Sequence, residues 1–256
     1  MDNVTGQQRW KAIITKLRVV HDSSDEQGLI GALSAPRSAT VLGFVNAHAM
    51  NLVAGNAEYG KALMAADVLL RDGSGMAILF RRIGLAPGLN MNGTDLIPKV
   101  LAAFKGRRVA FWGTQEPFLS QAAQRCEALF GVQVVSVEHG FSEADTYIEL
   151  AQHLQPELIV LGMGMPKQEA IAATLAAAGG PCLIICGGAI LDFLGGKVTR
   201  APHWLRRLGA EWLFRLVREP KRLFMRYVVG NPLFLLRTLR CTKATMGGAA
   251  RSSRSA

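Results

Sequence analysis

Four short apolar runs are spaced regularly through the middle of the chain, at residues 108–112, 132–137, 158–161 and 182–186. They recur about every 25 residues. The segments between them carry apolar positions at helical spacing, at 117–130, 142–154 and 167–178. Strands that are apolar along their whole length are buried on both faces. Their alternation with helices is typical of a doubly wound parallel sheet.

Two earlier segments, 39–45 and 67–70, also have the pattern of strands, and a helix is expected near 49–65 between them. Residues 1–38 are weakly patterned, so we expect them at the periphery of the sheet. The sequence therefore predicts an α/β fold, with a mostly parallel sheet and helices on both of its faces.

The last quarter of the chain has a different pattern. Segments 203–217 and 221–229 can form helices, and Pro220 and Asn231-Pro232 interrupt them. Spacings of three and four residues predict that four arginines share one helical face beside apolar residues; they are Arg215, Arg218, Arg222 and Arg226.

Charge divides the chain at the same place. The 256 residues carry a formal net charge of +10. Residues 197–256 hold 14 Lys or Arg and two acids, which gives +12, whereas residues 1–196 hold 15 Lys or Arg and 17 acids, which gives −2. We predict a core at 1–196, a basic helical appendage at 197–246 and a flexible tail at 247–256.

Three interpretations of the basic appendage remain open. It is the solvated face of a packed helix pair, or a helix that rests on an anionic bilayer with aromatic residues among the headgroups. The third is a nucleic-acid-binding segment, although no recognised module accompanies the charge.

Composition excludes several classes of protein. Half of the residues are apolar, which argues against wholesale disorder, and no apolar stretch approaches the roughly 18 residues of a spanning helix. The first residues lack a charged head followed by an apolar run, so we expect no secretory signal and a cytoplasmic protein. Four scattered cysteines predict core thiols rather than disulfides or a metal site; they are Cys126, Cys182, Cys186 and Cys241.

Glycines follow the expected strands, at 72–75, 112–117, 162–169 and 187–188. Ligands of open α/β sheets bind beyond the carboxyl ends of the strands. Glycine lets backbone amides approach a phosphate, and a helix N-terminus favours its negative charge. The array predicts a nucleotide-type ligand, although the chain has neither a Gly-x-Gly-x-x-Gly fingerprint nor a P-loop.

Polar residues at two strand ends each have two interpretations. Asp72 either caps an expected helix at 75–82 or takes a proton from an acceptor hydroxyl. Asn46 either ends its strand or orients a sugar or phosphate. His48 lies near Asn46, but no Ser or Cys relay accompanies it.

The stretch 92–95 is equally ambiguous, because Thr94 or Asp95 could cap a helix at 96–104 or bind a ligand. The chain contains no Asp-x-Asp, the pair through which metal-dependent sugar transferases often hold a divalent ion. If the ligand is a nucleotide sugar, amides and basic side chains must neutralise its diphosphate.

Taken in order, these motifs resemble the WecG/TagA/CpsF family of bacterial glycosyltransferases over residues 25–235. The resemblance is carried by Asn46-Ala-His, Asp72-Gly-x-Gly, Gly93-Thr-Asp-Leu, Gly113, Gly162-Met-Gly-x-Pro-Lys-Gln-Glu, Cys186-Gly-Gly-Ala, Arg200-Ala-Pro, Glu211-Trp, Arg215, Glu219-Pro-Lys-Arg and Arg226-Tyr. The resemblance implies a Rossmann-like catalytic core and an inverting, metal-independent enzyme. Such an enzyme transfers a sugar from a UDP-sugar to a glycan on undecaprenyl diphosphate, as a peripheral protein at the inner face of the plasma membrane.

The resemblance also implies roles for single residues. Asp72 matches the proposed catalytic aspartate. The residues implied to bind the donor nucleotide and sugar are Asn46, Gly73, Asn92, Gly93, Thr94, Asp95, Gly113, Gly162, Gly164, Pro166, Lys167, Gln168, Glu169, Gly187 and Gly188. Those implied to meet the acceptor diphosphate and membrane are Arg200, Arg215, Arg218, Arg222 and Arg226. No cofactor, metal ligand or nucleic-acid partner is expected, and a homo-oligomer is left open.

Two departures from the family pattern bear on the donor sugar. Phe44 stands where many members have Thr, and 88–92 lacks the Arg that often precedes Gly-x-Asp-Leu. The pattern is similar to the GumM-like exopolysaccharide branch, which favours UDP-glucose. The alternatives are UDP-N-acetylmannosamine or its uronic acid and, in another class, a non-catalytic or redox nucleotide-binding protein.

Overall fold

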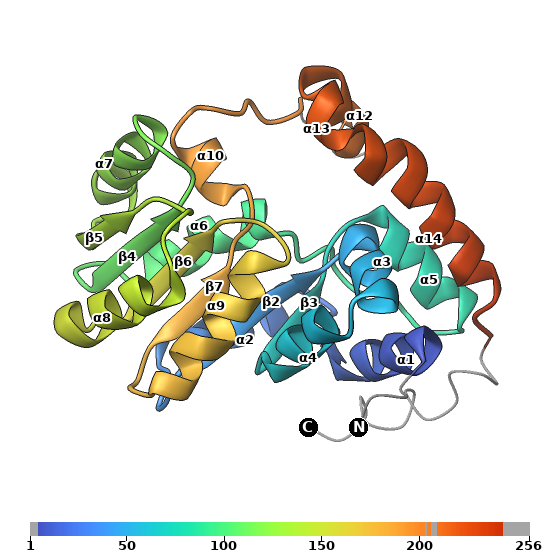
Figure 1. Cartoon of the computed structure of the whole chain (residues 1–256), viewed down its shortest axis with the longest axis horizontal. Coiled ribbons are helices and arrows are strands. Elements are labelled where there is room, and N and C mark those ends of the chain that lie inside the picture. The colour runs from blue at the N-terminus through green and yellow to red at the C-terminus, as the bar shows by residue number, and fades with distance from the viewer. Residues whose placement is uncertain (1–4, 203, 206–208, 243–256) are drawn as a thin grey trace.

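A seven-stranded, all-parallel sheet forms the centre of the computed structural model (Figure 1), which describes residues 5–202, 204–205 and 209–242. The strand order is β1-β3-β2-β7-β6-β4-β5. The strands are β1 (Leu17–Arg18), β2 (Thr40–Val45), β3 (Val68–Arg71), β4 (Arg108–Gly113), β5 (Gln133–Glu138), β6 (Leu158–Gly162) and β7 (Leu183–Cys186). The predicted α/β class is confirmed.

Helices cover both faces of the sheet and define two apolar clusters. One cluster lies beneath α1 (Gly6–Lys16), α3 (Ala47–Gly55), α4 (Ala57–Ala65), α5 (Ser74–Arg82), α8 (Ala144–Leu154) and α9 (Lys167–Ala178). The other lies beneath α2 (Ser23–Ser34), α6 (Gly93–Ala103), α7 (Phe118–Phe130) and α10 (Ile190–Leu194). Strand β4 explains the continuous apolar runs, because Ala110 and Trp112 enter the first cluster while Val109 and Phe111 enter the second.

The amino-terminal region contributes more than was predicted. Residues 1–38 were expected at the periphery of the sheet, and there they form the edge strand β1, which pairs with β3, together with helices α1 and α2. The single helix expected near 49–65 is two helices, because Asn56 ends α3 and caps α4 by accepting a hydrogen bond from the Tyr59 amide at 2.9 Å.

From Glu211 to Leu239, the appendage forms three helices and a π-helical turn. They are α12 (Glu211–Arg218), α13 (Pro220–Phe224), the turn Met225–Val229 and α14 (Gly230–Leu239). Asn231-Pro232 does not interrupt this segment as expected; it lies in the first turn of α14, where the missing proline N–H costs little. Residues 203, 206–208 and 243–256, with part of the predicted helix 203–217 and the predicted tail, lie outside the described residues.

The second half of the appendage is anchored to the core, and the first half crosses over the sheet. Helix α14 packs on α3 and α5, where the Asn51 amide donates to the Gly230 carbonyl and accepts from Arg237, both at 2.7 Å. Phe234 is buried against Trp10, with ring centroids 5.5 Å apart. Figure 1 shows α12 and α13 as the orange-red end of a strap above the carboxyl edge of the sheet.

The strand order opens a crevice beneath this strap. Strands β2 and β7 are neighbours, but the helix after β2 covers one face of the sheet and the helix after β7 covers the other. Ligands of open α/β sheets bind where the helices that follow two neighbouring strands lie on opposite faces of the sheet.

Candidate active site

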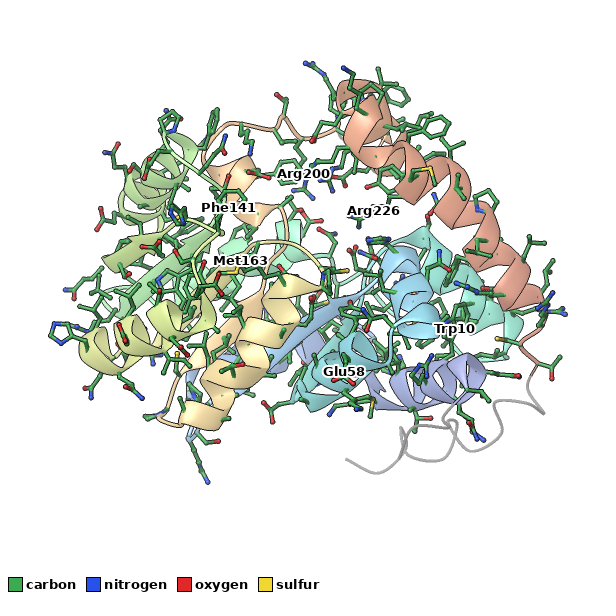
Figure 2. All side chains as sticks on the ribbon, viewed as in Figure 1. Trp10, Glu58, Phe141, Met163, Arg200 and Arg226 are labelled. Carbon is green, nitrogen blue, oxygen red and sulfur yellow. The ribbon has the colours of Figure 1, made fainter. Side chains whose placement is uncertain are left out.

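One cavity of about 910 Å³ occupies this crevice. Its floor comes from the residues that follow β2, β3, β4, β6 and β7, and its roof comes from the appendage. Figure 2 shows Arg200 and Arg226 on the side of the appendage that faces the sheet edge, with Phe141 and Met163 across the gap. A cavity of this size holds a ligand as large as a nucleotide sugar.

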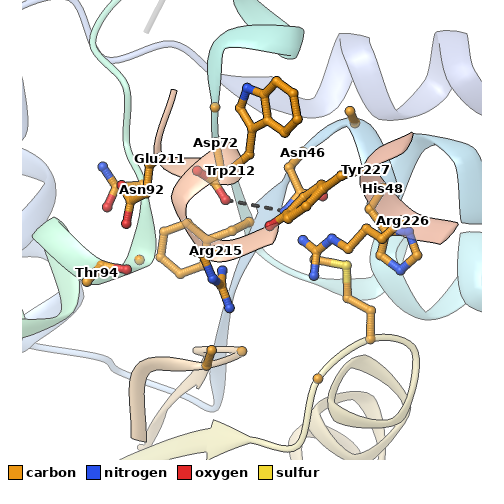
Figure 3. Close-up of a pocket in the computed structure, with 18 of the residues that line it drawn as sticks. Asn46, His48, Asp72, Asn92, Thr94, Glu211, Trp212, Arg215, Arg226 and Tyr227 are labelled. Atoms are coloured by element: carbon orange, nitrogen blue, oxygen red, sulfur yellow. Dashed lines mark hydrogen bonds between the residues drawn. The ribbon is translucent and has the colours of Figure 1, made fainter. Parts of the chain in front are cut away.

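Asp72 lies at the centre of this cavity (Figure 3). It directly follows β3, and its amide donates to the Val45 carbonyl at 2.9 Å. The capping interpretation is wrong, because α5 begins after Gly73 without a side-chain cap. The Asp72 carboxylate instead accepts a hydrogen bond from Asn46 Nδ2 at 3.3 Å.

Opposing effects set the proton affinity of Asp72. Burial raises its pKa, while the hydrogen bond from Asn46 and the charges of Arg226, Arg215 and Arg71 lower it in part. Among the described residues, no Lys or Arg forms a direct ion pair with Asp72, so its carboxylate is available as a general base.

Asn46 connects this carboxylate to the core. Its Oδ1 caps α3 by accepting from the Ala49 amide at 3.1 Å, while its Nδ2 faces Asp72. Asn46 therefore ends its strand as a helix cap, and the cap fixes the orientation of the amide that donates to Asp72; contact with a sugar or phosphate stays a prediction.

The loop before α6 is organised by Arg71, a buried residue that the sequence analysis did not single out. Its guanidinium donates to the carbonyls of Pro87, Gly88 and Gly73 at 2.7–3.0 Å. Its only sequence signal is a cation at the end of an otherwise apolar strand. Asn90 then accepts a hydrogen bond from the Gly73 amide at 2.7 Å, which ties this loop to Asp72.

Asn92, rather than Thr94 or Asp95, caps helix α6, which begins at Gly93 instead of residue 96. Asn92, Gly93 and Thr94 line the cavity. Asp95 does not; it accepts from Asn92 Nδ2 at 2.7 Å and pairs with Arg200 at 2.6 Å.

The glycine loops shape the cavity, but several of their amides are already used. Gln168 Oε1 accepts from the amides of Gly164 and Gly188, at 3.2 and 2.9 Å, and the Gly187 amide donates to Leu161. With the Gly73 amide bound to Asn90, these four glycines do not form the expected amide cradle for phosphate. Gly187 is needed for space, because a Cβ there would lie 2.6 Å from Ile190.

Part of the predicted 162–169 segment lies behind the cavity wall. Gly162, Gly164 and Gln168 line the cavity, as do Gly187 and Gly188, whereas Gly113, Pro166, Lys167 and Glu169 do not. Gln168 Nε2 donates to Glu169 Oε1 at 2.9 Å, and burial raises the pKa of Glu169 to about 6. Lys167 Nζ donates a hydrogen bond to the Ser142 carbonyl at 3.0 Å.

Arginines of the appendage form the cationic side of the cavity. Arg215, Arg222 and Arg226 line it, and the buried Nε atoms of Arg215 and Arg226 have no hydrogen-bond partner in the described chain. Burial lowers the pKa of Arg226, and the charge of Arg215 lowers it further. Buried guanidinium nitrogens without acceptors indicate an anionic ligand.

The predicted single basic face is wrong. Helix α12 ends at Arg218 and α13 begins at Pro220, so the helical spacing is broken between Arg218 and Arg222. Arg215 and Arg226 face the cavity, whereas Arg218 lies outside it, over the ring of Phe214. Outside the cavity, the appendage exposes several large apolar side chains; they are Trp204, Val217, Phe224, Met225, Val229, Leu233, Leu236 and Leu239.

His48 lines the cavity beside Arg226. Burial, together with the charge of Arg226, lowers the pKa of His48 to about 4. The imidazole is therefore neutral near pH 7, and it adds no positive charge to the anion-binding side of the cavity.

Three cavity residues beyond β4 were not singled out from the sequence. Thr114 Oγ1 donates to Asp192, and Lys197 Nζ lies 3.3 Å from the same carboxylate. Thr114 has a positive φ of 47°. Its position immediately after an apolar strand is the one signal that could have identified it.

Other expectations concern sites outside this cavity. All four cysteines are free; Cys126, Cys186 and Cys241 are buried, as predicted for core thiols, whereas Cys182 is only partly buried against the first apolar cluster. The described ranges contain no group of three or more His, Cys, Asp or Glu side chains that could hold a metal ion. Nor does any helix in these ranges combine the length and the apolar character needed to cross a membrane.

Residues 16–247 match the glycosyl transferase WecG/TagA/CpsF family. This chain belongs to that family. It is also 26% identical over 196 residues to the N-acetylglucosaminyldiphosphoundecaprenol N-acetyl-beta-D-mannosaminyltransferase of Bacillus spizizenii, an alignment that covers 74% of this chain and 75% of the relative. The resemblance stated from the motifs is confirmed, and the protein is a glycosyltransferase.

Within this WecG/TagA/CpsF glycosyltransferase, the family match extends across the core and the appendage alike. The cavity is built from both parts, since its floor belongs to the sheet and its roof to α12 and the π-helical turn. The appendage therefore supplies part of the candidate active site.

Proposed function

We propose that this glycosyltransferase moves a sugar from a UDP-sugar to a glycan carried on undecaprenyl diphosphate, with inversion and without a metal ion. The observation that supports this most strongly is the juxtaposition of Asp72 with Arg215 and Arg226 in one cavity. A carboxylate suits the removal of a proton from a hydroxyl, and the arginines suit a diphosphate.

In the proposed reaction, the acceptor hydroxyl attacks the anomeric carbon from the face opposite the diphosphate. Asp72 takes the hydroxyl proton as the new carbon–oxygen bond forms, and the bond to the diphosphate breaks with its electron pair on UDP. The negative charge on the leaving group is stabilised by appendage arginines, because the amides of Gly73, Gly164, Gly187 and Gly188 already have partners.

The donor sugar is the finer part of the proposal. Phe44 lines the cavity near the end of β2, and residues 88–92 lack the arginine that many family members carry before Gly-x-Asp-Leu. These residues favour UDP-glucose. The name of the Bacillus relative favours the alternative, N-acetylmannosamine.

The proposal also places the protein on the inner face of the plasma membrane. The exposed apolar side chains of α12 to α14 support it, because some of them, such as Leu213 and Val228, also line the cavity. A lipid-linked acceptor would enter from this side, with its diphosphate near the arginines.

The experiment is UDP release from UDP-glucose, UDP-N-acetylmannosamine and UDP-glucuronic acid, with and without a polyprenyl-diphosphate glycan, in EDTA. We expect acceptor-dependent release from one donor, which would identify the sugar. Activity that disappears in EDTA and returns with a divalent ion would contradict metal independence. If none of the three UDP-sugars released UDP in the presence of the lipid-linked acceptor, the proposed donor class would be contradicted.

A further inference from the structure

A carboxylate of the appendage also reaches the cavity. Glu211 is the first residue of α12 and lines the cavity together with Asp72. Figure 3 shows it near Asn92 on the Asp72 side of the pocket. The core thus supplies Asp72 and Asp192 to the cavity, and the appendage supplies Glu211 to the same cavity.

Glu211 has no hydrogen-bond donor among the described residues. Among the described residues, the cation paired most closely with it is Arg200, whose Nε lies 3.9 Å from Glu211 Oε1, beyond hydrogen-bond distance. Two nearby acids are directly paired: Asp95 with Arg200 at 2.6 Å, and Glu219 with Arg222 at 2.6 Å. A half-buried carboxylate without a donor has room for a ligand that donates one.

Charge indicates which ligand group fits there. Burial raises the pKa of Glu211, and the nearby carboxylates of Asp72 and Asp95 raise it as well, against the effects of Arg200 and Arg215. A phosphate placed among these acids would be repelled, whereas a neutral hydroxyl would donate to them. A sugar therefore suits the space between Asp72 and Glu211, and the diphosphate belongs beside Arg215 and Arg226.

Arg200 connects Glu211 to the core. It pairs with Asp95, which accepts a hydrogen bond from Asn92, and it approaches Glu211 from the same guanidinium group. This chain of contacts runs from the N-terminus of α6 to the N-terminus of α12. Arg200 is off the cavity wall, so the structure favours a positioning role over direct contact with a diphosphate.

We propose that Glu211 accepts hydrogen bonds from sugar hydroxyls in the active site, and that Arg200 positions it. The inference rests on the proposed function and extends it. The hydroxyls belong to the donor sugar or to the acceptor glycan, two sources with the same chemistry that experiment separates. Sugar recognition then requires the appendage to be in place over the sheet.

The test compares Glu211→Gln with wild type in the full chain. Calorimetry measures the dissociation constants of UDP and of the UDP-sugar identified as donor, and steady-state transfer gives KM for the lipid-linked acceptor. A hydrogen bond to a charged group supports an expected loss of roughly 10- to 100-fold. We expect this loss in the UDP-sugar constant if the donor sugar is the source, or in the acceptor KM if the acceptor is. UDP affinity should stay within about twofold.

Glu58→Gln is the matched control, because Glu58 is an exposed helical acid far from the cavity that pairs only with a neighbouring lysine. Arg200→Gln tests positioning in a double-mutant cycle. In the wild-type background, Arg200→Gln should weaken the same constant that Glu211→Gln weakens. In the Glu211→Gln background, it should have little further effect on that constant. If Arg200→Gln caused the same loss of affinity in wild type and in Glu211→Gln, the positioning role of Arg200 would be overturned.

Two failures are distinguishable. If wild type transfers the sugar and Glu211→Gln keeps both the UDP-sugar constant and the acceptor KM within twofold, the role of Glu211 is overturned and the proposed function stands. If wild type binds neither UDP nor any UDP-sugar, the proposed function fails and the inference fails with it.

Discussion

Burial and hydrogen bonding act against each other at Asp72. The cavity withdraws the carboxyl from water, which raises its pKa, while Asn46 and three arginines favour the charged form. A group balanced in this way can take a proton during the reaction and release it afterwards. Asn46 is essential to the balance, because its other amide atom is fixed by the cap of α3.

Asp72→Asn should lower kcat by about 10²- to 10⁴-fold, the usual contribution of a general base. UDP affinity should persist, since the arginines remain. Because burial raises the pKa of Asp72, the acid limb of the wild-type pH–rate profile should have its midpoint above 3.8, the ordinary value for aspartate. Steady-state kinetics and UDP calorimetry check both points, and near-full activity of the variant would exclude Asp72 as the base.

Glu169 has a comparable environment without access to the cavity. Its folded-state pKa of about 6 lies above the ordinary 4.5 because the carboxyl is buried. Its protonated form is favoured in the folded state, so its contribution to stability is complete below pH 4.5 and is lost as pH rises through 6.

Glu169→Gln should therefore gain stability relative to wild type between pH 4.5 and 7, by about 2 kcal/mol. The gain arises because the neutral amide avoids burying a charge while it can still accept from Gln168. Urea unfolding of both proteins at pH 4.5 and 7 gives the difference, with Glu58→Gln as the surface-charge control. A pH-independent difference would contradict the prediction.

Helix α14 and the segment α12–α13 have different connections to the core. Phe234, Asn51 and Arg237 fix α14 against α1 and α3, whereas no side chain of α12 is fully buried. The π-helical turn Met225–Val229 joins the two parts and carries Arg226 into the cavity. Positioning of the arginines over Asp72 therefore depends on the anchoring of α14.

Phe234→Ala should remove about 3–5 kcal/mol of stability, the usual loss for a buried aromatic. It should also lower transfer activity at temperatures where the protein stays folded, because the anchor of the arginine-bearing turn is weakened. Leu233→Ala is the control, since Leu233 is an exposed neighbour on the same helix. Urea unfolding and steady-state kinetics measure the two effects, and equal behaviour of the two variants would contradict the anchoring role.

Polar and apolar surfaces are distributed unevenly over the protein. The inner side of the appendage carries the arginines that line the cavity, and its outer side exposes apolar residues such as Val217 and Met225. The core buries its large apolar side chains in two clusters, one on each face of the sheet. An exposed apolar surface of this extent, next to the cavity, is the feature that supports membrane contact.

Val217→Glu combined with Met225→Glu should reduce co-sedimentation with anionic vesicles, because both side chains are exposed and would place charge at the headgroup layer. Activity on a water-soluble acceptor analogue should be retained. Leu129→Glu is the matched control, an equally exposed apolar residue on α7 in the core. Unchanged sedimentation of the double variant would contradict membrane contact through this surface.

Much of the core could be predicted from local pattern. The apolar runs identified six of the seven strands, because a strand covered on both faces leaves a continuous apolar signature. Strand β1 was missed because a two-residue edge strand carries too little pattern. The start of α6 was predicted at residue 96 because 92–95 contains several residues that can cap a helix. In the structure Asn92 is the cap, and its side chain accepts a hydrogen bond from the Asp95 amide.

The sequence by itself determined the fold class, the glycosyltransferase family and the strand ends that carry Asp72 and Asn46. It could do so because apolar runs and motif spacing depend on residues that are close together in the chain. Tertiary structure decided which amides are free, which arginines face the cavity and that Glu211 joins Asp72. These contacts join segments far apart in the chain, such as Gly188 with Gln168 and α14 with Asn51. Helical spacing predicts which residues share a face, but only packing determines what that face meets.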